Sequence, residues 1–190
     1  MEGAGFSPRD VRGAGALLQN RRIAATSHAF SPDPRSRHRS RTLAQTSASA
    51  PKRSTTDTLH LTVTTSTSGA IVAPGGRVSL FVDVALKPKM HVYAPEEKVN
   101  MPISLQVDRT SSVTVRPPIF PKGESFLFAP TGETQIVYSR PFRIEVPVTM
   151  ARTQKAGVFV LSGTFRYQAC DDQVCYIAKS VRLTWDVTIR

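Results

Sequence analysis

The chain has 190 residues, a formal net charge of +11 and a hydrophobic content of 40%, which suits one domain of common size with a tail. The charge is uneven: residues 1–55 contain ten Lys/Arg and three Asp/Glu, whereas residues 56–190 contain fifteen and eleven. Since residues 56–190 have no Lys/Arg-rich run that could form a basic face, we expect no nucleic-acid binding. No run of about 18 apolar residues occurs, so we expect a chain that does not span a membrane.

Residues 1–55 are rich in Ala, Ser, Arg and Gly and poor in Val, Ile and aromatic residues. Such a segment cannot bury enough apolar surface to offset its ordering entropy, so we predict a disordered or targeting tail. Its longest apolar piece, residues 13–18, is too short for a secretory signal and is followed by Arg21 and Arg22. An organelle transit peptide and a start codon placed upstream of the true beginning fit this composition equally.

From Thr58 onward, apolar and polar residues alternate, which is typical of half-buried strands. The strand-like segments, in chain order, are residues 59–63, 78–86, 90–94, 103–107, 113–115, 136–138, 142–148, 158–169 and 180–189. Turn residues separate them and no convincing helix interrupts them. The pattern predicts an all-β sandwich over residues 56–190, with Trp185 in its core.

Residues 120–133 are the one long segment that we expect to form no strand. They carry Phe126, Leu127 and Phe128 between a glycine and a proline. Apolar side chains in a loop need a surface to cover them. Two interpretations follow: the loop folds back on its own core, or it is a lid over an active site.

Cys170 and Cys175 are the only cysteines, and the four residues between them lie between two strand-like segments. This arrangement predicts a hairpin tip. Facing residues of an antiparallel pair have Cα atoms about 4.5–5.5 Å apart, within the roughly 4.4–6.8 Å that a disulfide needs. A bond could therefore form and break with little backbone movement, which makes thiol–disulfide chemistry the leading hypothesis.

Three other interpretations of the cysteines stay open at this point. A static disulfide is one, although so short a ring would contribute only about 2 kcal/mol in the chain-entropy model. A metal site would need His60 or His91 to join the two thiolates, and neither histidine has ligand spacing to them. A pair of ordinary reduced thiols is the third. The spacing is also not the Cys-x-x-Cys of thioredoxin-type motifs.

The segment Tyr-Gln-Ala-Cys-Asp-Asp-Gln-Val-Cys-Tyr, residues 167–176, resembles the active-site segment of the N-terminal periplasmic domain of the DsbD thiol:disulfide interchange family. Residues 87–95, 120–123 and 142–148 resemble further elements of that domain in the same order. The resemblance covers residues 58–189. It departs in the spacing, since the best-known member has five residues between its cysteines, and in Ile177 and Ala178, where prolines are usual.

The resemblance implies an immunoglobulin-like β-sandwich that acts as an electron-transfer domain of the thiol:disulfide oxidoreductase type rather than as a complete enzyme. It implies a thioredoxin-like or membrane-linked electron donor, extracytoplasmic disulfide or cytochrome-maturation proteins as acceptors, and no cofactor or metal. A periplasmic or otherwise extracytoplasmic location follows, although the sequence has no clear signal peptide. We expect the chain to act with a separate partner or to be a fragment, because no membrane domain or thioredoxin module follows.

By matched position, the resemblance makes Cys170 and Cys175 the redox pair, with Cys175 meeting the partner and Cys170 resolving the mixed disulfide. Tyr93 would lie near them, and His91 stands where many relatives have a second tyrosine. The remaining residues expected beside the pair are Phe126 and Phe128 as cap aromatics, Tyr167, Asp171 and Asp172.

Asp171 and Asp172 allow two interpretations. Their charges could raise the pKa of a neighbouring thiol, or they could act only as turn formers. Two rival functions also remain: a non-redox immunoglobulin-like binding module with a structural disulfide, and a metallochaperone that uses Met90, His91, Met101 and the cysteines.

Overall fold

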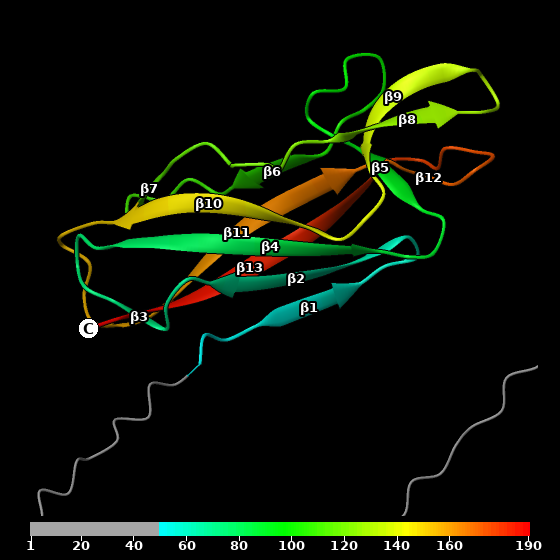
Figure 1. Cartoon of the computed structure of the whole chain (residues 1–190). Coiled ribbons are helices and arrows are strands. Elements are labelled where there is room, and N and C mark those ends of the chain that lie inside the picture. The colour runs from blue at the N-terminus through cyan, green and yellow to red at the C-terminus, as the bar shows by residue number, and fades with distance from the viewer. Residues whose placement is uncertain (1–49) are drawn as a thin grey trace, which may run out of the picture. The chain divides into compact units, whose positions relative to one another are not determined.

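The computed structural model describes residues 50–190, which form strands and no helix (Figure 1). The expected disordered or targeting tail therefore lies almost wholly outside the described residues. The strands are β1 (Ser54–Asp57), β2 (Leu61–Thr67), β3 (Ile71–Val72), β4 (Arg77–Leu86), β5 (His91–Tyr93), β6 (Ser104–Val107), β7 (Val113–Val115), β8 (Glu124–Phe128), β9 (Glu133–Tyr138), β10 (Phe142–Met150), β11 (Gly157–Tyr167), β12 (Ala169–Cys170) and β13 (Lys179–Ile189). No helix able to cross a membrane is found in this part of the chain.

The strands form three sheets. The first has the order β1-β2-β4-β10-β7, the second β3-β13-β11-β6, and the third β12-β5-β9-β8. All pairs are antiparallel except β3 with β13. The first two sheets form the sandwich, and the strands of the third lie together at one end of it (Figure 1). The predicted all-β fold is confirmed.

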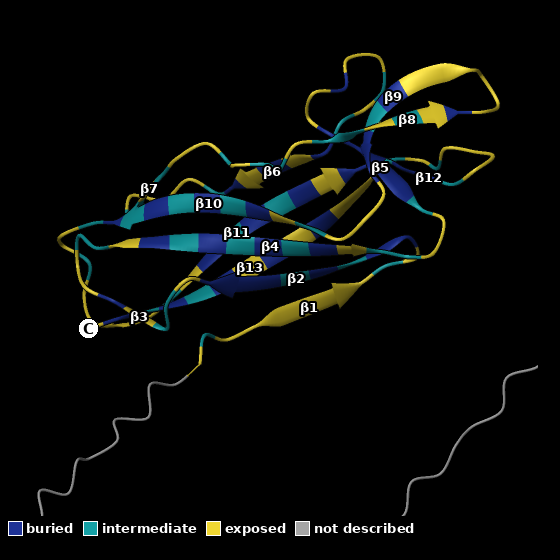
Figure 2. Cartoon of the chain, viewed as in Figure 1, coloured by how far each residue is buried: buried dark blue, intermediate teal, exposed yellow. Residues whose placement is uncertain are grey.

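Alternating side chains from both main sheets fill the core, as the banded strands of Figure 2 show. Val78, Leu80, Val82 and Val84 point inward from β4, and the apolar positions of β13 meet them from the other sheet. Trp185 is buried among them, and its Nε1 donates a hydrogen bond to the Phe81 carbonyl, 3.0 Å away. The indole thereby satisfies its only polar atom across the sandwich.

The long hairpin of β11 and β13 connects the core to the cysteines. Its register extends from Gly157 opposite Ile189 to Tyr167 opposite Lys179, so residues 168–178 form the connection. Gly163 makes the packing possible, since a Cβ there would come within 2.7 Å of the Gln106 carbonyl oxygen and 3.1 Å of the Trp185 ring. The connection is thus attached to a pair of strands that packs closely against its neighbours.

Two expectations from the sequence were wrong. Residues 124–128, expected in a loop, form strand β8, which pairs with β9. Flanking prolines and glycines hid a five-residue strand that has one apolar face. Leu59, expected in a strand, is 81% exposed in the bend between β1 and β2. Strand β1 begins at Ser54, and its exposed side chains explain why no apolar alternation marks it in the sequence.

We predict that Leu161→Ala destabilises the fold by about 2–5 kcal/mol, because Leu161 is fully buried opposite Trp185. The neighbouring Val160→Ala is the matched control. Val160 faces solvent from the same strand, so its truncation should change stability by less than about 0.5 kcal/mol. Urea unfolding of the two variants measures both values, and equal effects would contradict this assignment of the two faces of β11.

Candidate functional site

Cys170 and Cys175 form a disulfide at the tip of the β11–β13 connection, with Cα atoms 4.0 Å apart. Two backbone hydrogen bonds close the tip: Asp171 N–H donates to the Val174 carbonyl and Tyr176 N–H to the Ala169 carbonyl. The predicted hairpin tip is therefore present, with the two Cα atoms closer together than the roughly 4.4 Å lower bound expected from the sequence. The two cysteines differ in access, since Cys170 is 0% exposed on β12 whereas Cys175 is exposed.

Asp171 holds the turn between the cysteines. Its Oδ1 accepts hydrogen bonds from the backbone N–H groups of Gln173 (2.8 Å) and Val174 (2.9 Å), and its Oδ2 accepts one from the Tyr176 hydroxyl (2.7 Å). The Tyr176 hydroxyl and then the two backbone donors lower the pKa of Asp171 to about 2. The turn-forming interpretation of Asp171 has direct support in these contacts. Asp172 is more exposed, and the Lys89 ammonium lies 3.7 Å from it.

Tyr93 is the buried polar group nearest to the disulfide. Its hydroxyl oxygen lies 3.2 Å from the sulfur of Cys170 and 3.2 Å from that of Cys175. Disulfide sulfurs carry no proton, so the phenol is the donor. Burial, and then the negative charge of Glu97, raise the pKa of Tyr93, while a hydrogen bond with Gln135 opposes them. The phenol therefore stays protonated and able to donate.

His91 lies directly across the strand pair from Cys170, in the register of β5 with β12. It is buried, and its Nε2 has no hydrogen-bond partner among the described residues. Burial lowers the pKa of His91, against the opposing effects of Asp172 and Asp171. The imidazole is therefore neutral at neutral pH.

The hairpin of β8 and β9 covers these groups. Phe126 packs against the cluster of Tyr93, Val137 and Cys170, and its ring centroid lies 4.5 Å from that of His91. Phe128 is buried with its ring edge-on to His91, at 6.3 Å. Leu127, between them, points away and is 64% exposed. Of the two cap aromatics expected from the sequence, Phe126 thus lies beside Cys170 and Phe128 beside His91, on a strand and not on a loop.

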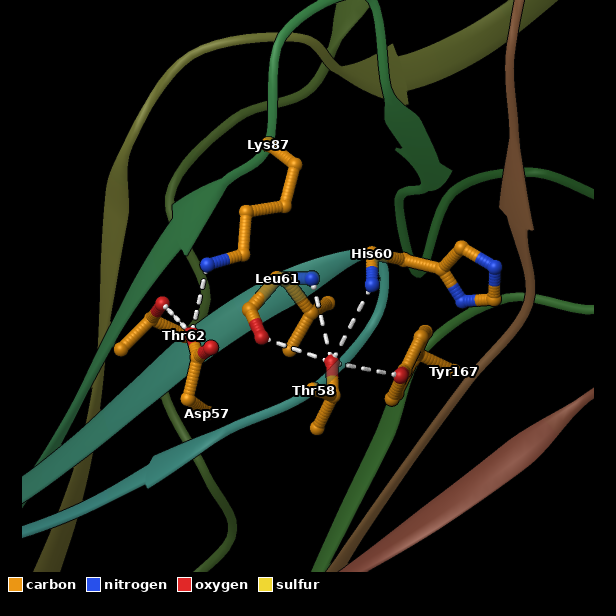
Figure 3. Close-up of polar contacts among 7 residues, drawn as sticks. All are labelled: Asp57, Thr58, His60, Leu61, Thr62, Lys87 and Tyr167. Atoms are coloured by element: carbon orange, nitrogen blue, oxygen red, sulfur yellow. Dashed lines mark hydrogen bonds and ion pairs between the residues drawn. The ribbon is translucent and has the colours of Figure 1, made fainter.

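Tyr167 has a different position from the other expected neighbours. Its hydroxyl donates to Thr58 Oγ1, which also accepts the backbone N–H of Leu61 and donates to the Leu61 carbonyl (Figure 3). His60, in the same bend, stacks on Tyr176 with ring centroids 4.5 Å apart. The Thr58–Leu61 bend therefore supports the base of the cysteine connection from the side opposite to His91 and Phe126.

Three residues of the site had no signal in the sequence. Gln135 is buried on β9 opposite Phe126, and its Oε1 has no partner among the described residues. Val137 packs in the cluster with Tyr93 and Cys170. Glu97 accepts backbone hydrogen bonds from Ile136 and Val99, which lower its pKa. Only the pairing of β5, β8 and β9, which the sequence did not predict, brings them to the cysteines.

The described residues show no group of metal ligands that would support the metal-binding interpretation. Within residues 50–190, no three His, Cys, Asp or Glu side chains gather as metal ligands would. Met101 is exposed, and Met90 packs against the hydrophobic core.

The sequence of the chain matches the model of a known protein family. The family model described as "Thiol:disulfide interchange protein DsbD, N-terminal" matches residues 50–184. The chain belongs to this DsbD N-terminal domain family. A search of curated protein sequences gave no match.

A solved structure agrees with the fold of this DsbD-type domain. The N-terminal periplasmic domain of ScsB from Proteus mirabilis is 15% identical, with a TM-score of 0.50 over 72% of this chain and 52% of that one. The chain thus spans about half the length of that protein. The reduced N-terminal domain of Neisseria meningitidis DsbD is 21% identical over 58% of this chain and 76% of that one, with a TM-score of 0.38. The family match and the ScsB structure confirm the expected immunoglobulin-like sandwich.

We predict that the Asp171 carboxyl titrates near pH 2 in the folded DsbD-type domain, against an ordinary value of 3.8. Because the folded pKa is lowered, the contribution of this carboxylate to stability is complete above about pH 4 and is lost as the pH falls through about 2. Tyr176→Phe removes the largest cause and should raise the pKa of Asp171 toward 3.8. NMR titration of the carboxyl carbon measures both, and an identical pKa in the variant would refute the role of Tyr176.

Proposed function

We propose that the β-sandwich of residues 56–190 is a thiol–disulfide exchange module, which relays reducing equivalents between a thioredoxin-like or membrane-linked donor and extracytoplasmic acceptor proteins. The observation that carries the proposal is the asymmetry of the disulfide. Cys175 is exposed at the tip, while Cys170 lies fully buried beneath the β8–β9 hairpin. One sulfur can meet a partner while the other is kept from stray thiols.

The exchange follows from this asymmetry. A thiolate of the donor attacks Cys175 Sγ, the bond between the two cysteine sulfurs breaks, and Cys170 leaves as a thiolate that then takes up a proton. The second thiol of the donor attacks the mixed disulfide and leaves Cys175 reduced. Transfer to an acceptor is the reverse: Cys175 attacks the acceptor's disulfide, and Cys170 then closes the ring and releases the reduced acceptor.

Tyr93 supports the buried end of this reaction. Its hydroxyl already points at both sulfurs from 3.2 Å. Charge on the Cys170 sulfur develops in a site without bulk water, where a hydrogen bond to an anion is worth more than one to a neutral sulfur. The phenol therefore stabilises the leaving thiolate without moving.

The proposal also specifies the protein partners of the domain and its cellular location. The cysteine pair itself carries two electrons, so the relay needs no cofactor, and the domain works as an electron-transfer unit whose donor and acceptor are separate proteins or domains. Cytochrome-maturation proteins and other extracytoplasmic thiol proteins are the acceptors, and the periplasm or an equivalent compartment is the location. The ScsB domain, to which this chain is similar, is a periplasmic domain, and this supports the location.

The reduction potential tests the proposal against a purely structural disulfide. Equilibration with glutathione, followed by thiol alkylation and mass spectrometry, should show two thiols that appear together at a potential well above about −300 mV, since structural disulfides typically lie below that value. A potential below it, or a failure to gain two alkylated thiols, would instead support a non-redox binding module.

Cysteine variants test the assignment of roles. Cys170→Ser should form a stable mixed disulfide with glutathione, because the exposed Cys175 reacts and no second thiol resolves the product. Cys175→Ser should form little, because Cys170 is 0% exposed. Intact-mass spectrometry after equal exposure to glutathione disulfide measures both. Similar yields of the mixed disulfide from the two variants would contradict the roles assigned to Cys170 and Cys175.

The cap is tested by Phe126→Ala. Removing the ring uncovers the cluster that contains Cys170, so dithiothreitol should reduce the disulfide faster. Leu127→Ala is the matched control, because this side chain lies on the same strand and points to solvent. Reduction rate and melting temperature are measured together on both variants. An unchanged rate with a large fall in melting temperature would show that Phe126 is only a core residue.

A further inference from the structure

His91 and Cys170 face each other across β5 and β12, so their side chains leave the sheet on the same face. Both are buried, with 2% and 0% exposure. The Nε2 of His91 has no partner among the described residues, and the two disulfide sulfurs carry no proton to donate. A neutral imidazole offers one nitrogen as a proton acceptor. Reduction of the disulfide would give Cys170 an S–H donor on the same face of the sheet as His91.

The closing step of the exchange needs such an acceptor. When Cys170 attacks the mixed disulfide at Cys175, its thiol has to lose a proton, because the thiolate is the nucleophile. Cys170 is fully buried, so bulk water does not reach its sulfur. The proton therefore passes to a group of the protein.

Among the described residues around Cys170, only one is a suitable base for its thiol. The Tyr93 hydroxyl is a protonated phenol, which donates to sulfur and does not remove its proton. The Asp171 carboxylate already accepts three hydrogen bonds and has a pKa of about 2, so it is a very weak base. Asp172 is exposed and lies against Lys89. His91 is neutral, buried and without a partner.

We propose that His91 is the base that removes the proton of the Cys170 thiol when Cys170 closes the disulfide. The inference rests on the proposed function. The S–H bond of Cys170 breaks and an N–H bond forms on His91. The thiolate forms the bond to Cys175 Sγ, and the bond from Cys175 to the acceptor protein breaks as the acceptor leaves as a thiolate. The imidazolium later releases its proton to water. In the opposite direction, the imidazolium returns a proton to the Cys170 thiolate.

The charges around His91 set the pH dependence. Strand β8 contributes only the rings of Phe126 and Phe128, and β9 contributes the neutral Gln135. Tyr93 on β5 is uncharged, while Asp171 and Asp172 on the cysteine connection favour the imidazolium, with Lys89 beside Asp172. Because burial outweighs these carboxylates, the pKa of His91 lies below 6.5. The rate at which Cys170 closes the disulfide should be independent of pH above that pKa. It should fall at lower pH as His91 becomes protonated.

Oxidation of the reduced full-length chain by dithiobis(nitrobenzoate) separates the two steps. Attack by Cys175 releases one nitrothiolate at a rate proportional to the reagent, and closure by Cys170 releases a second at a rate independent of it. His91→Gln keeps a polar side chain of similar reach but no base. Its second phase should slow by about a hundredfold at neutral pH, within the 10²–10⁴-fold typical of general bases. Its first phase should change less than about twofold, because Cys175 is exposed.

The pH profile separates a base from a structural role. In the unaltered chain the second phase should fall as the pH drops through the pKa of His91, whereas in His91→Gln this fall should be absent, because the base that titrates there is gone. A second phase that is unchanged in His91→Gln, or slowed by the same factor at every pH, overturns the proposal. Val160→Ala, which changes a solvent-facing side chain of β11, is the control and should leave the second phase within about twofold.

A measurement on the unaltered chain protects the test against a variant that fails to fold. Nitrogen NMR should show the Nε2 resonance of His91 shift on reduction, as it begins to accept the Cys170 thiol, while the resonances of His60 stay in place. An unmoved His91 resonance overturns the proposal. Failure of the proposed function gives a different result, since the unaltered chain would then show no second, reagent-independent release at all.

Discussion

The pairing of β5 with β12 is the contact on which the site depends. Successive residues of a strand point to opposite faces, and this pair uses both faces. Val92 and Ala169 join the main hydrophobic core, whereas His91, Tyr93 and Cys170 lie on the other face under Phe126. A shift of β12 by one residue in this register would turn Cys170 toward the core and Ala169 toward the cap. The core packing that anchors Val92 therefore also fixes the geometry of the sulfurs.

The long β11–β13 hairpin supplies the second constraint. Its eleven paired positions carry Trp185 and Phe165, and the connection with the cysteines begins where that pairing ends. Thr58 and His60 support the connection from one side, through Tyr167 and Tyr176, and the third sheet holds it from the other. A two-residue strand such as β12 is marginal alone. It is ordered because both of its neighbours in the chain are tied to well-packed structure.

The alternating segments predicted most of the sandwich because each of these strands has one buried face and one exposed face. β4 and β13 were clear for this reason, and Trp185 could be placed in the core. β8 could not be recognised, because it has five residues, an exposed Leu127 and prolines nearby. The cysteine tip was predictable from spacing, since residues 171–174 can only turn back. The partners that cover it come from β5, β8 and β9, and long-range pairing of such short strands leaves no local pattern in the sequence.

Asp171 shows why the sequence could not decide between a turn former and a charge that controls the thiols. Both roles belong to the same carboxylate. Its three hydrogen bonds close the turn and keep it ionised, so the negative charge stays beside the cysteine pair across the physiological pH range. That charge disfavours a thiolate and favours an imidazolium at His91. The one carboxylate therefore both closes the turn and places a negative charge beside the cysteine pair and His91.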